Sequence, residues 1–515
     1  MVDDLDLAIY TDSLSSSPPL PDGKYVAKAL LELQYFPFVK DEDEELPPLF
    51  STSDFTQDVA VEIDALPQSH RERGWVEFRA RRFDGLSRRL GIPHPVPYSR
   101  LVLHVRDNWT DIQSVLDSTT SVIAPRRHDD GRLIQMNYDT AEESHERHTR
   151  LALGMEFMVN ADVSNCFPSI YAHSLDWVLR GKAVAKRVRT RRTWQEELDR
   201  RTRAMTDGET KGLLIGPAIS NVLSEVVLQA VDRELKEFRY TRAVDDYTVF
   251  CETREEAERF VSKLQLALAT YRLDVNRRKT SIRDLRDGLS DSWMAEVRSH
   301  LPDSDGSSIK VVQFIQHAEL LAKGHPNRSV MKFAVKSVLG PRAESDSLTV
   351  FELTRASHFH PHLLPMLSRE IGKLGSTDLY VVKRDLVDPL SIQLGKALDR
   401  DETDTVLWLL YIARAQLGHG VRPLHVRAAL RLNSDLVWLA LMKLRLVSPK
   451  RLANYMSTLS LIEQSDFDEH WLGRYELFRR GLLAKPKAFE EPWMTVLAGR
   501  GVRFVRRGRL AKAKP

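Results

Sequence analysis

The chain has 515 residues, 42% of them hydrophobic, and its 75 basic and 72 acidic residues give a net charge of only +3. That length suits roughly two to four domains, and the near-neutral total does not by itself indicate a nucleic-acid-binding protein. Two cysteines, Cys166 and Cys251, exclude a disulfide scaffold and a cysteine-rich zinc site, and the sequence has no apolar stretch long enough to predict a membrane span.

The first part of the chain predicts an arm followed by helices. Residues 1–24 are polar and Pro-rich, and 25–39 have the apolar content of a short helix. Residues 70–118 are basic with a helical pattern that HPVPYS interrupts, so residues 1–94 are predicted to be an N-terminal arm and helical segment. The acidic N-terminus lacks the features of a signal peptide, and we expect a cytoplasmic protein with no membrane association.

The pattern changes in the middle of the chain. Residues 156–163 and 247–251 are short and rich in Val and Phe, as strands are, whereas 218–238 and 255–273 carry apolar residues at helical spacing. Strand, long helix, strand and helix in this order predict an α/β unit, to which we assign residues 95–287.

The C-terminal half predicts helices almost throughout. Residues 288–308 are rich in Ser, Asp and Gly and are predicted to be a linker. In 309–515, Trp408, Trp438 and Trp471 recur in similar apolar segments. This weak repetition favours an all-α HEAT-like repeat domain with a basic C-terminal tail, and the alternative is an ordinary helical bundle with tryptophans in its core.

Four short motifs in the α/β unit stand in a specific order. They are MVNADVSNCFPSIY (158–171), KGLLIGPAISNVLSE (211–225), RAVDDYTVF (242–250) and LDVNRRKTSI (273–282). The adjacent aspartates of the third motif repel each other, and a hairpin turn is the simplest reason to find them between apolar runs. A bound cation is the alternative reason.

The chemistry of nucleotidyl transfer explains the set better than a turn does. The reaction uses two divalent ions, for which we expect Mg²⁺ with Mn²⁺ as a substitute. Mg²⁺ is bound by carboxylate oxygens of the protein and phosphate oxygens of the substrate. Asp162 at a strand end and Asp245 in a neighbouring hairpin are predicted to share both ions, with the backbone carbonyl of Val163 as a further ligand. Asp246 is the next residue, so we expect its side chain to point to the other side and to be the weaker ligand.

Together the motifs resemble the palm of a reverse transcriptase. Its successive motifs resemble four segments here: Asp162 with FPSI, the GLLIGP loop, Ala243-Val244-Asp245-Asp246, and Asn276-x-x-Lys279. The resemblance covers about residues 95–285. GLLIGPAISNVLSE and RAVDDYTVF, followed by a helical half, are more narrowly similar to abortive-infection (Abi) and defence-associated bacterial reverse transcriptases. The resemblance implies a right-hand palm and fingers.

The resemblance also implies residue roles. Phe167 would lie under the sugar of the incoming nucleotide and favour deoxynucleotides, with a core phenylalanine as the alternative. Gly216 and Pro217 would let the backbone approach the base and primer, and Ser220 would either join them or cap its helix. Lys279 would meet the triphosphate, and its alternative is a solvated surface lysine.

Arginines and basic runs are the remaining candidates for phosphate contacts. Arg126 and Arg127, or Arg132, would belong to the fingers and clamp the triphosphate. The run KRVRTRR lies between two motifs, and GRGVRFVRRGRLAKAKP ends the sequence; such runs contact phosphates without sequence preference, although a solvated helix face is the alternative. From the first run we predict nucleic-acid contacts by Lys186, Arg187, Arg189, Arg191 and Arg192.

These features predict a DNA polymerase that adds dNTPs to a 3′-hydroxyl, and the resemblance implies a role in defence against phage. Abi-type relatives extend single-stranded DNA without a template from a tyrosine, which here would be Tyr10, and they form homo-oligomers. Leu214 and Ile215 stand where templated enzymes often carry Pro and Gln, and Ala243 replaces an aromatic residue that contacts the primer end. These departures put ordinary template reading in doubt.

Two other functions stay open at this point. One is synthesis of cDNA on an RNA template, as in retron or group II intron relatives. The other is a catalytically inactive scaffold whose helical solenoid binds a partner, although the presence of Asp162, Asp245 and Lys279 counts against it.

Overall fold

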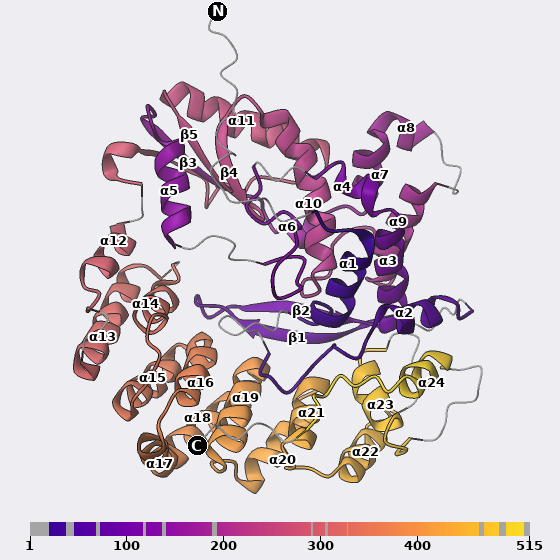
Figure 1. The fold of residues 1–515 in the computed structure, drawn as a ribbon, viewed down its shortest axis with the longest axis vertical. Coiled ribbons are helices and arrows are strands. Elements are labelled where there is room, and N and C mark those ends of the chain that lie inside the picture. The colour runs from indigo at the N-terminus through magenta and orange to yellow at the C-terminus, as the bar shows by residue number, and fades with distance from the viewer. Residues whose placement is uncertain are drawn as a thin grey trace, which may run out of the picture.

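A sheet with helices packed on it lies at one end of the molecule, and an arc of helices from the C-terminal half lies at the other (Figure 1). The computed structural model describes residues 20–37, 46–67, 73–116, 120–135, 141–187, 193–289, 292–303, 307–326, 328–462, 468–483 and 491–508. Within these residues, no helix has the length and apolar character needed to cross a membrane.

The four-stranded sheet is antiparallel throughout, with strand order β4-β5-β3-β6. Its strands are β3 (Phe157–Asp162), β4 (Arg239–Ala243), β5 (Asp246–Cys251) and β6 (Ser281–Asp284). Helix α11 (Arg254–Thr270) packs on β3, β5 and β6, and its N-terminus is capped by the Thr253 hydroxyl. The strands and helices expected between 156 and 273 are therefore confirmed.

Helix α10 (Ile219–Asp232) lies at the centre of this part, and each of its residues is buried. It is enclosed because apolar residues lie on all of its sides and its two acidic residues are paired with a buried arginine, Arg242. The helices around it are α1 (Gly23–Lys28) with a π-helical turn (Ala29–Leu33), α2 (Gln57–Asp64), α3 (Pro95–Asp107), α4 (Trp109–Gln113), α5 (Ala141–Leu151), α6 (Cys166–Ser169), α7 (His173–Arg180), α8 (Lys182–Arg187) and α9 (Trp194–Ala204), with 3₁₀ turns at Arg233–Leu235 and Leu285–Asp287.

A β-hairpin lies where the sequence pattern predicted helix. Strands β1 (Trp75–Arg81) and β2 (Ser87–Pro93) pair antiparallel, with Val76 opposite Ile92. Their buried residues alternate along β1, and Gly85 adopts the left-handed conformation (φ 77°) that its tight turn requires. The prediction of helix over 75–93 was wrong because the exposed arginines mask a two-residue alternation.

The arc that follows consists of helices only. It comprises α12 (Ser292–Ser299), α13 (Ser308–Gly324), α14 (Val330–Leu339), α15 (Ser347–Phe359), α16 (Leu364–Gly372), α17 (Ser376–Asp385), α18 (Val387–Asp399), α19 (Thr403–Leu410), α20 (Pro423–Arg431), α21 (Asp435–Lys443), α22 (Pro449–Thr458), α23 (Trp471–Phe478) and α24 (Pro492–Gly499), with a 3₁₀ turn at Pro361–Leu363 and a π-helical turn at Tyr411–Leu417. Helix α12 falls inside the segment expected to be a linker, and its Trp293 is buried against Phe333.

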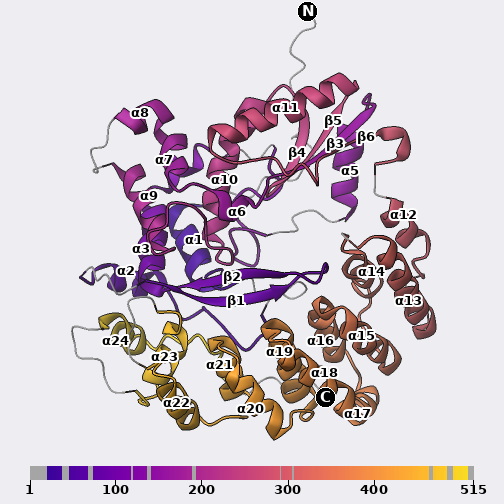
Figure 2. The same cartoon turned by 180° about the vertical axis from the view of Figure 1, so that it is seen from behind.

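Successive helices of the arc pack on one another and then on the hairpin. The three recurring tryptophans, Trp408, Trp438 and Trp471, are buried on α19, α21 and α23, and α21 contacts both of the other two helices. Helices α19 and α23 also contact β1, and the hairpin separates the arc from the sheet in both views (Figures 1 and 2). The hairpin is therefore the platform on which the C-terminal helices rest.

Chain segments near the two ends lie side by side. Phe50 forms an antiparallel bridge with Val505, and the Arg506 amide donates to the Leu49 carbonyl. The buried rings of Tyr35 and Trp471 stack with centroids 6.3 Å apart. The N-terminal segment is thus packed between α3 and the end of the helical arc.

Candidate active site

Asp162 ends strand β3 with its carboxylate already bound by two side chains. Its Oδ1 accepts a hydrogen bond from Asn276 Nδ2 at 2.8 Å, and Lys279 Nζ lies 2.6 Å from Oδ2. The Asp162 carbonyl also accepts from the Asn276 amide at 2.7 Å. The first and fourth sequence motifs are therefore joined at this carboxylate.

The aspartate pair lies at the turn between β4 and β5. Val244 adopts a left-handed conformation (φ 58°), and the Asp245 carbonyl accepts from the Val163 amide at 3.2 Å. Asp246 begins β5 directly opposite Asp162 in the antiparallel register, so the two residues share a face of the sheet. The expectation that Asp246 points to the other side was wrong, because simple alternation does not carry through a left-handed turn.

The charge of Asp162 raises the pKa of both carboxyl groups of the aspartate pair. Loss of hydration and then the charge of Asp162 raise the pKa of Asp245. Loss of hydration, followed by the charges of Asp245 and Asp162, raises the pKa of Asp246 to about 7, and Lys279 opposes both shifts. Asp246 keeps an exposed side chain next to the other two carboxylates, whose charges raise its pKa. The site concentrates negative charge that a cation would stabilise.

The donor set has the chemistry that Mg²⁺ prefers, because it consists of carboxylate oxygens. Within the described residues, no group of three or more His, Cys, Asp or Glu side chains is arranged to hold a metal ion by itself. Mg²⁺ in such enzymes is held by one or two carboxylates and completed by substrate phosphates. Asp162 and Asp245, with Asp246 beside them, therefore suit a site that is completed by its substrate.

A fully buried ion network supports the turn from behind. The Arg242 guanidinium on β4 bonds Glu225 at 2.8 Å and Asp232 at 2.7 Å, both on α10. It also donates from Nη1 to the Val244 carbonyl at 2.8 Å, and Tyr247 donates to Asp232. Burial raises the pKa of Asp232 despite Arg242, whereas Arg242 outweighs burial at Glu225 and lowers its pKa.

Sequence reasoning missed this network, although a signal for it existed. Glu225 and Asp232 stand seven residues apart on an otherwise apolar helix, which places them on one face. Two acids on the same face of a buried helix require a basic partner. Arg242, three residues before the aspartate pair, is that partner.

The glycine loop packs between the first aspartate motif and the β1–β2 hairpin. Gly216 (φ 135°) approaches the hairpin so closely that a Cβ would lie 2.8 Å from the Gly91 carbonyl oxygen. The Gly91 amide donates to the Ile215 carbonyl at 2.8 Å, and buried Pro217 follows. The loop requires glycine at 216 for a steric reason, and the nucleotide contacts of Gly216 and Pro217 stay predictions.

Ser220 ties this loop to its helix. Its hydroxyl donates to the Leu214 carbonyl at 2.6 Å. The N-cap of α10 is Ala218, which has no side-chain cap bond, so the prediction of Ser220 as a cap was wrong. The capping residue was misplaced because the N-cap lies two residues before the first hydroxyl of the segment.

Phe167 lies on the short helix α6 and is only 6% exposed, within the hydrophobic core. Its carbonyl accepts from the Leu213 amide at 2.8 Å, which connects it to the glycine loop. In this structure the ring belongs to the core, and the role below a nucleotide sugar stays a prediction. Cys166 and Cys251 are free and buried, as expected.

The candidate fingers arginines contact the N-terminal segment and residues of their own loop. Arg127 pairs with Asp22 at 2.7 Å and lies over the Tyr25 ring. Arg132 forks onto Asp130 at 2.6 Å. Arg126 is exposed, and its amide donates to the Leu133 carbonyl. No contact places any of these three arginines at the carboxylates within the described residues, so a triphosphate clamp stays a prediction.

A basic surface with aromatic rings lies on α7 and α8. Lys182, Lys186 and Arg272 gather around the Trp177 ring, with the Lys182 ammonium 4.7 Å from its centroid. Burial, then Lys186 and Arg272, lowers the pKa of Lys182, which shows like charges crowded together. Arg187 ends α8. Arg189, Arg191, Arg192 and Tyr10 lie outside the described residues.

Comparison with known proteins identifies the central domain. Residues 109–298 match the family model "Reverse transcriptase (RNA-dependent DNA polymerase)". A search of the curated proteins finds no match. Residues 109–298 of the chain therefore match a reverse-transcriptase domain.

Two solved structures of telomerase show slight similarity to the chain. Apo telomerase from Candida tropicalis truncated from its C-terminal domain is 13% identical with a TM-score of 0.30, over 44% of this chain and 52% of that one. Apo telomerase from the same organism is 10% identical with a TM-score of 0.34, over 90% of this chain and 76% of that one. The chain spans about half of the first structure, and similarity at this level establishes no function.

Proposed function

We propose, from the reverse-transcriptase domain at 109–298, that the chain is a Mg²⁺-dependent DNA polymerase that adds dNTPs to a 3′-hydroxyl. The observation that supports this most is the arrangement of Asp162, Asp245 and Asp246. They come from two separate motifs, and each raises the pKa of another or has its own pKa raised. A structural turn would not require a third carboxylate opposite the pair.

The chain's own side chains have distinct tasks in this reaction. Asp162 and Asp245 would hold the metal ions, which lower the pKa of the attacking hydroxyl and neutralise the triphosphate when bound. Asn276 fixes the orientation of Asp162 through a 2.8 Å hydrogen bond. Lys279 is 56% exposed, so its ammonium is free to turn from Asp162 to a phosphate oxygen without leaving a buried position.

Untemplated, protein-primed synthesis in anti-phage defence is the form of this activity that we infer. Leu214 and Ile215 carry no side-chain polar group for a template base, and Leu214 is packed against Gly91 of the hairpin. The primer would be a tyrosine, for which Tyr10 is the candidate. We interpret the C-terminal helices as HEAT-like, since α19, α21 and α23 pack in succession, and we expect a cytoplasmic homo-oligomer.

The test is synthesis by nuclease-treated, nucleic-acid-free protein with dNTPs and Mg²⁺. We expect product that persists after RNase treatment and mass added covalently to one tyrosine of the intact chain. Asp245→Asn should abolish both, while Asp287→Asn, at an exposed aspartate on the same domain, should retain them. Synthesis only when an RNA template is supplied would favour cDNA synthesis, and unchanged synthesis by Asp245→Asn would exclude this active site.

A further inference from the structure

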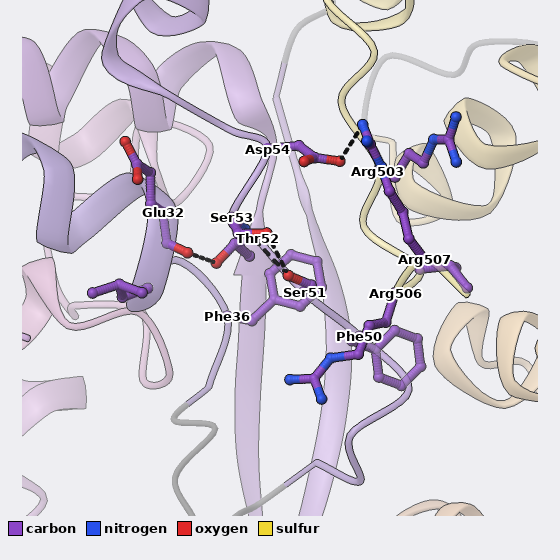
Figure 3. Close-up of a pocket in the computed structure, with 12 residues that line it drawn as sticks. Glu32, Phe36, Phe50, Ser51, Thr52, Ser53, Asp54, Arg503, Arg506 and Arg507 are labelled. Carbon is purple, nitrogen blue, oxygen red and sulfur yellow. Dashed lines mark hydrogen bonds and ion pairs between the residues drawn. The ribbon is translucent and has the colours of Figure 1, made fainter. Parts of the chain in front are cut away.

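A cavity lies where the N-terminal and C-terminal segments meet, and the residues that line it are far along the chain from the aspartate motifs. It has a volume of about 410 Å³. Figure 3 shows residues of 32–54 on one side and Arg503, Arg506 and Arg507 on the other. We call it the arginine pocket, and its size falls in the range of ~300–1,000 Å³ that is typical of small-molecule sites.

The arginines of this pocket have few acidic partners. Arg507 lies 3.3 Å from Asp54, the one carboxylate that bonds an arginine of the pocket in the described part of the chain. The Nε of Arg503 is buried with no hydrogen-bond partner. Arg506 bonds Leu49 and Lys443 only through its backbone. A buried guanidinium nitrogen without an acceptor is able to donate to an anionic ligand.

Acidic residues next to the pocket are already engaged. Glu476, which is fully buried, accepts from Arg479 and Arg480 and from the backbone amides of Phe504 and Val505. It is therefore fully used in holding the C-terminal segment in place. Burial raises the pKa of the Glu32 carboxyl, and the charge of Lys28 opposes that shift.

Further basic residues lie close to the arginines of the pocket. Burial lowers the pKa of Lys443, and the charges of Arg480, Arg506 and Arg445 lower it further. Burial also lowers the pKa of Arg480, which Glu476 opposes and Arg479 and Arg503 reinforce. Cations so close together repel one another, and a bound polyanion relieves that repulsion.

The remaining walls suit an organic phosphate better than a bare ion. The rings of Phe36 and Phe50 provide buried apolar surface, and the hydroxyls of Ser51 and Ser53 bond each other at 2.9 Å. Guanidinium forks match phosphate oxygens geometrically. An aromatic wall beside such forks matches a nucleobase or sugar next to its phosphate.

We propose that the arginine pocket binds the phosphate of a nucleotide, either free or within a single nucleic-acid strand, through Arg503 and Arg506. The site is separate from the aspartates of the polymerase domain. It borders the glycine loop through the segment that carries Phe36, since the Gln34 carbonyl accepts from the Ala218 amide and a Cβ on Gly216 would lie 3.3 Å from Pro37. Occupancy would thus fix the segment against which the loop packs.

The experiment measures binding by the full chain in EDTA, so it does not depend on catalysis. The probes are dATP and, separately, a fluorescein-labelled dT20 strand. We expect R503Q/R506Q to weaken binding of at least one probe about tenfold or more. The probe that loses affinity identifies the source of the phosphate, and loss of both indicates that the pocket accepts either.

A matched control removes the same charge elsewhere. R286Q/R400Q alters two exposed arginines that pair with Asp284 and Glu402, away from the pocket, and its affinities should equal those of the unaltered chain. Equal affinity of R503Q/R506Q and the unaltered chain for both probes would overturn the proposal, as would failure of the unaltered chain to bind either.

A second measurement covers the case in which R503Q/R506Q does not fold. Arginine modification of the unaltered chain with phenylglyoxal is followed by peptide mass spectrometry, with and without each probe. We expect at least one probe to protect Arg503 and Arg506 but not Arg286. Equal modification with and without both probes would again overturn the proposal.

Discussion

The two hairpins of this molecule are stabilised in opposite ways. The β4–β5 hairpin, which carries the aspartate pair, is held by the buried network of Arg242, Glu225 and Asp232 within its own domain. The β1–β2 hairpin instead contacts two other parts of the molecule, the glycine loop and the helical arc. Gly91 bonds the glycine loop on one side, while Arg81 pairs with Glu402 at 2.8 Å on the helical arc.

This difference separates two tasks. A fully buried charge network loses much free energy when one partner is removed, so it fixes one local geometry, here the turn at Val244. The Arg81–Glu402 pair is less deeply buried than this network and joins two separate elements, so it is the weaker of the two. The β1–β2 hairpin can therefore transmit a shift of the helical arc to the glycine loop. The first hairpin positions carboxylates, and the second connects the polymerase domain to the C-terminal helices.

The largest expected effect comes from breaking the buried network. Arg242→Met leaves Glu225 and Asp232 buried without their cation, which should lower the free energy of unfolding by about 3–5 kcal/mol. Polymerase activity should fall with it, because Val244 loses the hydrogen bond that holds its carbonyl. Urea unfolding and dNTP incorporation measure the two effects.

The control for this variant is Tyr247→Phe, which removes only the hydrogen bond to Asp232. It should lower the free energy of unfolding by about 1 kcal/mol. If Arg242→Met is no less stable than Tyr247→Phe, the network does not support the hairpin as described.

The next effect concerns the contact between the glycine loop and the β1–β2 hairpin. Gly216→Ala places a Cβ 2.8 Å from the Gly91 carbonyl at a φ of 135°, and should destabilise the chain by about 1–3 kcal/mol. Gly208→Ala has a positive φ (85°) but open space around it, so it tests backbone strain alone at about 1 kcal/mol. Similar losses from both variants, by thermal unfolding, would mean that the close approach is unimportant.

A pH-dependent effect is expected at the tip of the β4–β5 hairpin. Asp246 has a pKa of about 7 in the folded chain, whereas the ordinary pKa of an aspartate is 3.8. The folded chain therefore binds more protons between these values, and Asp246 should reduce stability as the pH rises from about 4 to 7. Asp246→Asn removes this loss.

Thermal unfolding in EDTA should show this difference between the two chains. The stability of Asp246→Asn relative to the unaltered chain should increase over that range and level off above pH 7. A difference that stays constant between pH 4 and 8 would mean that Asp246 is not perturbed by its neighbours.

The sequence was sufficient for features that rest on local pattern. Asp162 at a strand end, the turn at Asp245, and α10 and α11 follow from periodicity and from known turn residues. The β1–β2 hairpin was also within reach, because Asp84-Gly85 is a typical hairpin turn. It was missed because Val76 and Phe78 alternate with the charged residues Glu77 and Arg79, which favoured a helical interpretation.

Other features depend on contacts that no local pattern contains. Asp246 faces Asp162 because of a left-handed residue at 244, and the sequence Ala-Val-Asp-Asp does not predict that conformation. The arginine pocket joins 32–54 to 503–507, and only the folded chain brings these segments together. Arg242 was visible in the sequence, but its two partners lie on a helix that periodicity alone describes as apolar.

The smallest effect tests whether the β1–β2 hairpin is held by weak, shared pairs. Glu402 is 5% exposed and lies 2.8 Å from Arg81 and 3.7 Å from Arg400. Arg81→Gln should therefore lower the free energy of unfolding by about 1 kcal/mol or less, since Arg400 still neutralises Glu402. Arg400→Gln alone should have even less effect, because its distance to Glu402 is longer.

The double variant distinguishes shared pairing from independent pairs. With both arginines removed, Glu402 is a nearly buried carboxylate without a cation, and the combined loss should exceed the sum of the single losses. Urea unfolding of the four chains gives this coupling energy directly. Strict additivity would show that Arg81 and Arg400 do not substitute for each other. The β1–β2 hairpin would then rest on other contacts, such as the hydrogen bond that the Trp471 indole N–H donates to the Ile92 carbonyl at 3.3 Å.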